Sequence, residues 1–412
     1  MAIRRRDFLK TAGGLSLTSG VLGTAAAAAA AEADSPDGAF GFADNKVPMN
    51  AANLCPMPTA ISQAVARFAD DLDVDMSGPN RRRVESHKNA ARDGLAAQLS
   101  VSPDEIAIVR NTSEANNVVV QGIALDAGDE VLLWDQNHPS NGVSWDVRAK
   151  RSGCSVRRMS VPVDAGSIDE VVDLFADAIG ERTRVVSFTH ISNVTGFRLP
   201  VREICSAIRR RNAGIHIHVD GAQTWGAVDI DIGATDCDSF SGSAHKWYMG
   251  PREVGLLYVR TERQASIWPG VVSIPWGGEA EPSVVGARRF EALGQRDDAA
   301  IAALAETVRF HDALTPAGVE RRATEIADLL RAALTDIDVP FVSSRNPAFT
   351  SNVIILSAQQ ENRPALLENV LRDGGIILAG VNGLRMSPHI YNTPDHVERV
   401  VRAIGRSRTL LG

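Results

Sequence analysis

Two residues with complementary chemistry, Asp220 and Lys246, each follow a short stretch with the pattern of a β-strand. An alternating apolar pattern leads to Asp220, and a second short pattern leads into residues 241–246. If the two strands are neighbours, their ends present a carboxylate and a primary amine to opposite sides of one ligand. A lysine amine can form an imine with an aldehyde, and a carboxylate can keep a pyridine nitrogen protonated. This pair is what pyridoxal 5′-phosphate (PLP) chemistry requires.

Short apolar runs alternate with longer amphipathic stretches along most of the chain, which is the pattern of an α/β domain. The candidate strands are 105–110, 130–134, 184–189, 215–220, 239–241 and 255–260, and the candidate helices are 82–98, 114–123, 167–178, 201–212 and 298–314. The alternation predicts a mainly parallel sheet with helices on both faces. Ligands bind beyond the carboxyl ends of the strands in such sheets, and the candidate site residues lie there.

The pattern changes near Pro316, after which one long helix at 321–334 precedes a strand near 351–356 and helices at 363–373 and 394–404. A length of 412 residues suits two packed domains. We divide the chain into a signal segment (1–33), an N-terminal segment (34–60), a large PLP-binding domain (61–315) and a small C-terminal α+β domain (316–412).

The composition is that of an ordinary soluble protein, with 44% hydrophobic and 23% charged residues and a net charge of −7. No excess of basic residues is present to neutralise phosphates, which argues against nucleic acid as a partner. The four cysteines, at positions 55, 154, 205 and 237, lack the spacing of a zinc site. We therefore expect no metal site, and buried free thiols.

The first 33 residues have the organisation of an export signal: a basic region, a weakly apolar stretch at 11–24 and an alanine run at 25–31. The apolar stretch is too short and glycine-rich for stable membrane insertion. Residues 5–10, Arg-Arg-Asp-Phe-Leu-Lys, resemble the twin-arginine signal. We expect the twin-arginine export machinery as a partner, cleavage between about residues 29 and 33, and a mature protein in the periplasm or outside the cell. A disordered basic tail is the alternative.

The segment 216–255 resembles the class V aminotransferases, a family of fold-type I PLP enzymes that includes cysteine desulfurases, selenocysteine lyases and isopenicillin N epimerases. The resemblance covers nearly all of the mature chain. Its most specific elements are Asp-x-x-Gln, from Asp220 to Gln223, and Ser-x-His-Lys, from Ser243 to Lys246. It implies a seven-stranded sheet, a Schiff base between PLP and Lys246, and pairing of Asp220 with the pyridine nitrogen. Gln223 would face the phenolic oxygen, while Ser243 and His245 would bind the phosphate.

The stretch 110–117 ends a strand and opens a helix, where free N–H groups and the helix dipole favour an anion. The hydroxyls of Thr112 and Ser113 add donors there, although either residue alone could be an ordinary helix cap. By the resemblance, this stretch is the phosphate-binding turn.

Three more residues match the family. His138 matches the histidine that stacks on the pyridine ring, and Asn193 matches the asparagine that binds the phenolic oxygen. Arg385 matches the arginine that clamps the substrate α-carboxylate, for which its planar fork is suited. The alternatives are a structural histidine and a surface salt bridge. We interpret His216 and His218, at alternate positions of one strand, as structural.

Two departures from the family pattern matter. Gln295 lies at or near the position where the family sends a threonine into the neighbouring subunit's phosphate site, although an amide can also donate a hydrogen bond. The loop 376–383, before Arg385, lacks the persulfide-forming cysteine of cysteine desulfurases. This absence argues against desulfurase activity by that mechanism.

By the resemblance, catalysis begins with removal of the Cα proton of an amino acid or peptide-like substrate, and Lys246 is the natural base. Transamination, epimerisation and β-elimination stay open. Because 2-keto acids should be scarce outside the cytosol, a reaction without a second substrate is favoured, which is most like an isopenicillin N epimerase. A C–S or C–Se lyase is the alternative enzyme, and an exported PLP or amino-acid binding protein is the non-enzyme alternative. The family also implies a homodimer.

Overall fold

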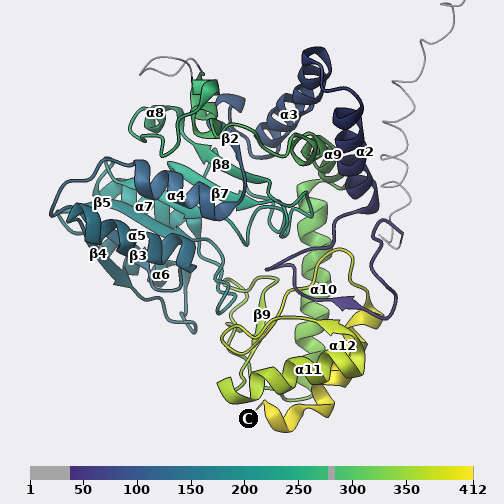
Figure 1. The fold of residues 1–412 in the computed structure, drawn as a ribbon. Coiled ribbons are helices and arrows are strands. Elements are labelled where there is room, and N and C mark those ends of the chain that lie inside the picture. The colour runs from purple at the N-terminus through teal and green to yellow at the C-terminus, as the bar shows by residue number, and fades with distance from the viewer. Residues whose placement is uncertain (1–37, 277–283, 412) are drawn as a thin grey trace, which may run out of the picture.

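The computed structural model describes residues 38–276 and 284–411, and a seven-stranded sheet forms its centre (Figure 1). In spatial order the strands are β2 (Ile106–Val109), β8 (Gly255–Val259), β7 (Ser239–Ser243), β6 (His216–Asp220), β5 (Thr183–Thr189), β3 (Glu130–Trp134) and β4 (Ser155–Met159). Strand β8 runs antiparallel to both of its neighbours, and the other neighbouring strands pair in parallel. Six strands therefore present their carboxyl ends at one edge. The predicted fold-type I α/β fold is confirmed.

Helices cover both faces of this sheet, because each face is lined by apolar side chains that must be buried. One face packs against α3 (Gly78–Gln98), α6 (Ile168–Asp177), α7 (Val201–Arg211) and α9 (Asp298–Leu314), and the other against α4 (Thr112–Gly122) and α5 (Pro139–Ser152). Helix α2 (Thr59–Val74) lies outside the sheet, against α3 and α9, and α8 (Thr261–Gln264) is a single turn after β8.

The elements predicted for the large domain are present, with ends displaced by a few residues. In this part of the chain the predictions missed α2, α5, α8 and β4. Helix α5 begins with Pro-Ser-Asn-Gly, residues that are typical of turns. Strand β4 lies at the edge of the sheet and is mainly polar, so it lacks the apolar run that revealed the inner strands.

A second hydrophobic core lies in the C-terminal part of the chain, around α10 (Pro316–Asp336), α11 (Arg363–Gly374) and α12 (Pro394–Arg406). Strand β9 (Ile354–Leu356) pairs antiparallel with β11 (Leu384–Met386), and β1 (Val47–Pro48) pairs in parallel with β10 (Ile376–Ile377). The N-terminal segment thus adds its strand, and the side chain of Met49, to this C-terminal core. Helices α9 and α10 meet at Thr315, which caps α10. The domain boundaries proposed above stay predictions.

All four cysteines are buried and free. No helix within 38–276 or 284–411 combines the length and the apolar character needed to cross a membrane. The proposed signal, residues 1–33, lies outside the described residues.

Candidate cofactor and substrate site

The residues predicted to form the site meet at one edge of the sheet. Asp220 and Ser243 end β6 and β7, while Thr112, His138 and Asn193 follow β2, β3 and β5. The turn after β7 carries Lys246, and β11 of the C-terminal part supplies Arg385. The parallel pairing of the strands brings together residues that are far apart in the sequence, as the strand-end pattern predicted.

The proposed phosphate turn is built where α4 begins. The helix is capped by Asn111, whose side chain accepts from Glu114 N at 3.0 Å, so the hydroxyls of Thr112 and Ser113 are not used as caps. Thr112 N–H donates to Ser243 Oγ at 2.7 Å, and the two hydroxyl oxygens lie 2.7 Å apart. A Cβ on Gly255 would lie 2.7 Å from Asn111 Cα, so only glycine lets β8 approach this turn. A helix N-terminus and two hydroxyls suit a phosphate.

Asp220 is buried, and backbone and side-chain donors hold both of its oxygens. Ala222 N–H donates to Oδ1 at 3.0 Å, and Asn116 Nδ2 donates to Oδ2 at 2.8 Å. Asn116 lies on α4 and is fully buried. Its contact joins residues 104 positions apart, and the sequence contains no spacing signal that could have revealed it.

Two charged groups of the site, Asp220 and Arg385, act on the amine of Lys246. Burial lowers the pKa of its amine, Asp220 opposes that effect, and Arg385 lowers the pKa further. A lowered pKa increases the fraction of neutral amine, the form that can act as a nucleophile or a base.

The N-terminal segment approaches the same turn, which the sequence did not predict. Gln223 donates to Ala52 O at 3.0 Å and accepts from Trp247 Nε1 at 2.7 Å. Cys55 N–H donates to His245 O at 2.9 Å. Burial, with the nearby Lys246 and Arg252 charges, lowers the pKa of His245 to about 4, so its imidazole is neutral at neutral pH.

His138 is the N-cap of α5, and its Nδ1 accepts from Ser140 N–H at 3.2 Å. Its ring is therefore held by the start of the helix. Burial lowers its pKa, and the Lys246 charge lowers it further. The helix-capping contact is structural, but it leaves the face of the ring available.

Arg385 is a buried cation without a carboxylate partner among the described residues. It donates to Asn193 O at 3.3 Å and to Asn50 Oδ1 at 3.5 Å, and its Nε has no partner. Burial lowers its pKa to about 10. A buried charge without a counter-ion is costly, so this guanidinium is suited to an incoming anion. The alternative of a surface salt bridge is wrong.

The polar groups of the site fit PLP, which carries a phosphate, a ring nitrogen and an aldehyde. The same end of the sheet presents a hydroxyl-lined helix start, a buried carboxylate, an amine of lowered pKa and the orphaned Nε of Arg385. Across 38–276 and 284–411, no group of three or more acidic, histidine or cysteine side chains is arranged to hold a metal.

Gln295, one departure from the family pattern, is hydrogen-bonded to side chains of its own chain. Gln295 accepts from Arg81 at 3.2 Å and donates to Asp298 at 3.0 Å, contacts within its own chain. Cys154 and Cys237 lie just before β4 and β7, at the edge of the sheet opposite the site. Burial raises the pKa of Cys55 and Cys237 to about 12.

The aminotransferase class-V family model matches residues 58–403. The isopenicillin N epimerase of Amycolatopsis lactamdurans is 32% identical over 383 residues, covering 86% of this chain and 94% of that enzyme. A cysteine desulfurase of Enterobacter sp. (strain 638) is 31% identical over 360 residues, covering 82% and 85%. The solved structure of the cystine C–S lyase C-DES with cysteine persulfide has a TM-score of 0.81 and 23% identity, covering 88% of this chain and 98% of that one.

Another structure of that lyase has glycine covalently linked to its PLP cofactor. The desulfurase relatives weaken the argument against desulfurase activity that the loop 376–383 provided, and the reaction stays open between these groups. The match over most of the chain settles the family: this chain belongs to the aminotransferase class-V family of PLP-dependent enzymes.

Proposed function

We propose that this protein epimerises the Cα of an amino acid or peptide-like substrate, as the isopenicillin N epimerases it resembles are named for doing. The observation that carries this proposal is the buried guanidinium of Arg385, whose Nε has no partner and whose charge lowers the pKa of the Lys246 amine. The guanidinium can bind the substrate carboxylate, and the amine can take the proton from the adjacent Cα.

Each residue has a separate task. PLP, when bound, supplies an electron sink that stabilises negative charge at the substrate Cα. Lys246 Nζ accepts the Cα proton on one face of the substrate, for which its lowered pKa is suited, and a solvent proton delivered to the opposite face inverts Cα. Asp220 would accept a hydrogen bond from the ring nitrogen of PLP. Arg385 holds the α-carboxylate, which fixes the direction of the Cα–H bond relative to Lys246. Ser243, Thr112 and Ser113 hold the phosphate.

A C–S or C–Se lyase is the second candidate, favoured by the relation to desulfurases and to a cystine lyase. β-Elimination needs no catalytic thiol, so it is compatible with a loop 376–383 that lacks cysteine. Persulfide transfer would need a thiolate, and burial raises the pKa of Cys55, Cys205 and Cys237. The non-enzyme alternative is a protein that binds PLP or an amino acid without turnover.

Incubation of the holoenzyme with single-enantiomer amino acids and short peptides in D2O separates these reactions. Epimerisation gives inverted product with deuterium at Cα, observed by chiral chromatography and mass spectrometry. The lyase gives pyruvate with sulfide or selenide, and transamination gives pyridoxamine phosphate.

Deuterium incorporation that is absent from the Lys246→Ala variant supports the proposed base. Pyruvate without inversion would assign the lyase reaction instead. A wild-type protein with no visible cofactor absorbance, or with cofactor and no exchange on any substrate, would support the binding protein.

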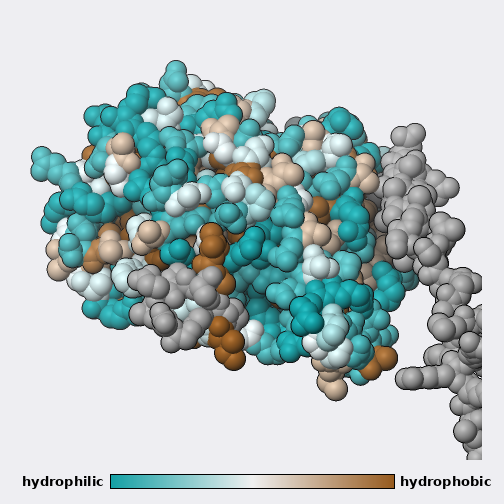
Figure 2. All heavy atoms as spheres, turned by 90° about the horizontal axis from the view of Figure 1, so that it is seen from above, coloured by the Kyte–Doolittle hydropathy of each residue, from teal (hydrophilic) through white to brown (hydrophobic). Residues whose placement is uncertain are grey.

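We also propose a homodimer. Exposed apolar side chains follow α8, among them Trp268, Val272 and Ile274, with Ile274 93% exposed. Together with Val271 and Leu293, Ser113 of the phosphate turn lines a cavity of about 500 Å³. Figure 2 shows a mainly hydrophilic surface on which hydrophobic side chains are exposed in small groups. A second copy seated here would complete the phosphate site.

Sedimentation of a Val271→Glu variant tests this interface. A monomer with weakened PLP binding supports it, and an unchanged dimer contradicts it.

Export by the twin-arginine pathway is a further proposal, supported by the pattern of residues 5–10. Fractionation of cells that produce the wild type or an Arg5→Lys, Arg6→Lys double variant tests it. Loss of the periplasmic or secreted pool in the double variant supports this route, and an unchanged distribution contradicts it.

A further inference from the structure

A row of polar side chains runs under the sheet, away from Asp220. On β6, His216, His218 and Asp220 alternate with apolar residues, and on β7 Ser239, Ser241 and Ser243 do the same. All six are buried, on the face that α4 covers. Buried polar groups are costly unless they are hydrogen-bonded, so each of these six side chains needs a partner inside the protein.

The row has a direction, which is set by Asn116. Its Nδ2 donates to Asp220 Oδ2 at 2.8 Å, so its Oδ1 faces the row as an acceptor. That oxygen accepts from Ser241 Oγ at 2.6 Å and contacts His218 Nε2 at 3.0 Å. A carbonyl oxygen cannot donate, so Nε2 of His218 must carry the proton.

The next two contacts keep the same direction. Burial lowers the pKa of His218 to about 3, so its ring is neutral and Nδ1 is an acceptor. Ser239 Oγ, 2.8 Å from Nδ1, therefore donates its only proton there. Ser239 then accepts from His216 Nε2, which lies 2.9 Å away. Each donor in the row points toward Asp220.

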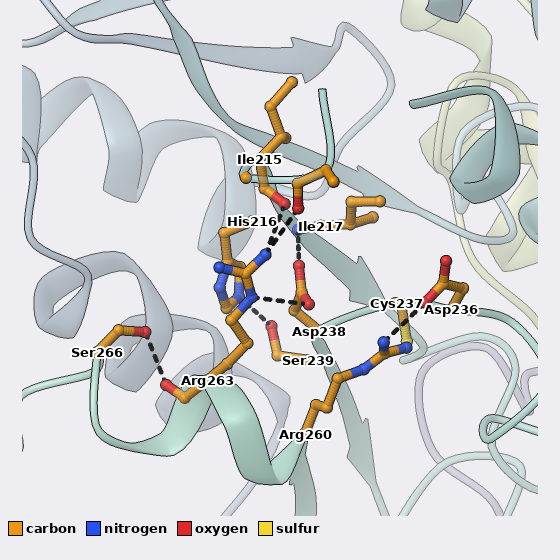
Figure 3. A network of polar contacts seen from close by, with 12 residues as sticks. Ile215, His216, Ile217, Asp236, Cys237, Asp238, Ser239, Arg260, Arg263 and Ser266 are labelled. Atoms are coloured by element: carbon orange, nitrogen blue, oxygen red, sulfur yellow. Dashed lines mark hydrogen bonds and ion pairs between the residues drawn. The ribbon is translucent and has the colours of Figure 1, made fainter. Parts of the chain in front are cut away.

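A second buried acid, Asp238, lies near the far end of the row and binds the backbone of β6 (Figure 3). Asp238 accepts from Ile217 N–H at 2.8 Å, from Arg209 at 2.7 Å and from Arg263 at 3.1 Å. Two arginines thus neutralise this end. The charged and titratable groups that face the row are His138, Lys246 and Arg385 near Asp220, and Arg209, Asp238 and Arg263 at the far end.

We propose that the chain of hydrogen bonds from His216 through Ser239, His218 and Asn116 is a positioning device that holds Asp220 as an acceptor for the ring nitrogen of PLP. This inference rests on the proposed role of Asp220. Hydrogen bonds in a chain polarise one another, so this chain of donors strengthens the hydrogen bond that holds the Asp220 carboxylate in place. A carboxylate acceptor held in that position keeps the ring nitrogen protonated.

Holoenzyme reconstituted with PLP labelled with ¹⁵N in its ring tests this directly, because the ¹⁵N chemical shift reports protonation of that nitrogen whatever the activity. We expect His218→Leu, which removes both contacts at similar volume, to lower the ring-nitrogen pKa by about one pH unit. Ser239→Ala should lower it less, and His216→Leu least, since these changes lie further along the chain. The side chain of His218→Gln can still donate to Asn116 and accept from Ser239. The ring-nitrogen pKa of this variant should therefore stay close to the wild-type value.

A matched control is His311→Leu. His311 is another buried neutral histidine, and it contacts Tyr248 O at 2.9 Å, outside the row. The proposal predicts no change of the ring-nitrogen pKa in this variant. Equal shifts in His311→Leu and His218→Leu, or no shift in any variant of the row, would overturn it. A wild type in which the ring nitrogen is not protonated would instead remove the role of Asp220, and with it the proposed function.

The direction of the chain can also be measured without cofactor. ¹⁵N NMR of histidine-labelled protein should find a proton on Nε2 and none on Nδ1 of His218, assigned by loss of the signal in His218→Gln. Ser239→Ala should leave the proton on Nε2, because Asn116 Oδ1 still requires a donor there. A proton on Nδ1 of His218 in the wild type contradicts the proposed direction.

Discussion

The site has two parts that differ in how many of their polar groups have partners within the protein. Its floor, which consists of Asp220, Asn116, His218, Ser239 and Ser241, is a buried set in which each side chain is hydrogen-bonded to protein. Its mouth, which consists of Lys246, His138, Asn193 and Arg385, contains a cation whose Nε has no partner. The floor is complete before any ligand arrives, whereas the mouth needs a ligand to be complete. The two parts should therefore respond in opposite ways to substitution.

The largest effect is expected at Lys246, in the mouth. Lys246→Ala removes the amine that takes the Cα proton, and turnover should fall by on the order of 10³-fold or more. Stopped-flow or steady-state assays measure this loss, with the substrate that the exchange experiment in D2O identifies. Deuterium exchange that persists in the variant would assign the proton to another base.

The second effect is a pH dependence of stability that comes from the buried histidines of the row. Burial lowers the pKa of His216 to about 4 and that of His218 to about 3, from about 6.5 in the unfolded chain. Between these values the unfolded state binds protons that the folded state does not, so stability falls as pH decreases below about 6.5. His218 alone should contribute about 3 kcal/mol to this loss by pH 4.

Urea unfolding from pH 7 to pH 4 measures that loss. The curve should be shallower for His218→Leu than for wild type. Identical slopes for the two proteins would show that His218 is not held neutral.

A third effect concerns the cation in the mouth. Arg385→Gln removes the charge that meets the substrate carboxylate, and kcat/KM should fall about 30-fold, or about 2 kcal/mol, mainly through KM. The reference substrate is an amino acid, and the control substrate is its amide, which lacks the carboxylate. An equal loss on both substrates argues against recognition of the carboxylate by Arg385.

The smallest effect is a change in the free energy of unfolding that should have opposite signs in the mouth and in the floor. Arg385→Met replaces a buried, unpaired cation with an apolar side chain, and should raise the free energy of unfolding of the cofactor-free protein by about 1 kcal/mol. Asn116→Ala, in the floor, leaves partners unsatisfied and should lower it. Denaturant unfolding of the two variants provides the measurement. Destabilisation by both would show that the mouth is as complete as the floor.

The parts of the site also differ in how far they could be predicted. Asp220, Ser243 and Thr112 stand at strand ends, and parallel pairing brings such positions together in any fold of this class. Asn116 and Asn50 carry no comparable signal, because their contacts depend on how α4 and the N-terminal segment pack.

His216 and His218 were interpreted as structural from their alternation on a strand. Their alternation is present in β6. What the pattern could not show is that the serines of β7 lie beside them at hydrogen-bonding distance. For the fold, apolar runs identified the inner strands and the edge strand β2, whereas the edge strand β4 was missed because most of its residues are polar.

The contact of Arg385 with Asn50 joins residues 335 positions apart. A ribosome synthesises the chain from its N-terminus, so Asn50 must wait for nearly the whole protein to be made before its partner exists. The sheet can begin to form much earlier, but a site able to hold a substrate carboxylate is among the last things that translation completes. Premature termination anywhere before β11 should therefore leave a protein that lacks this clamp, however well its sheet has folded.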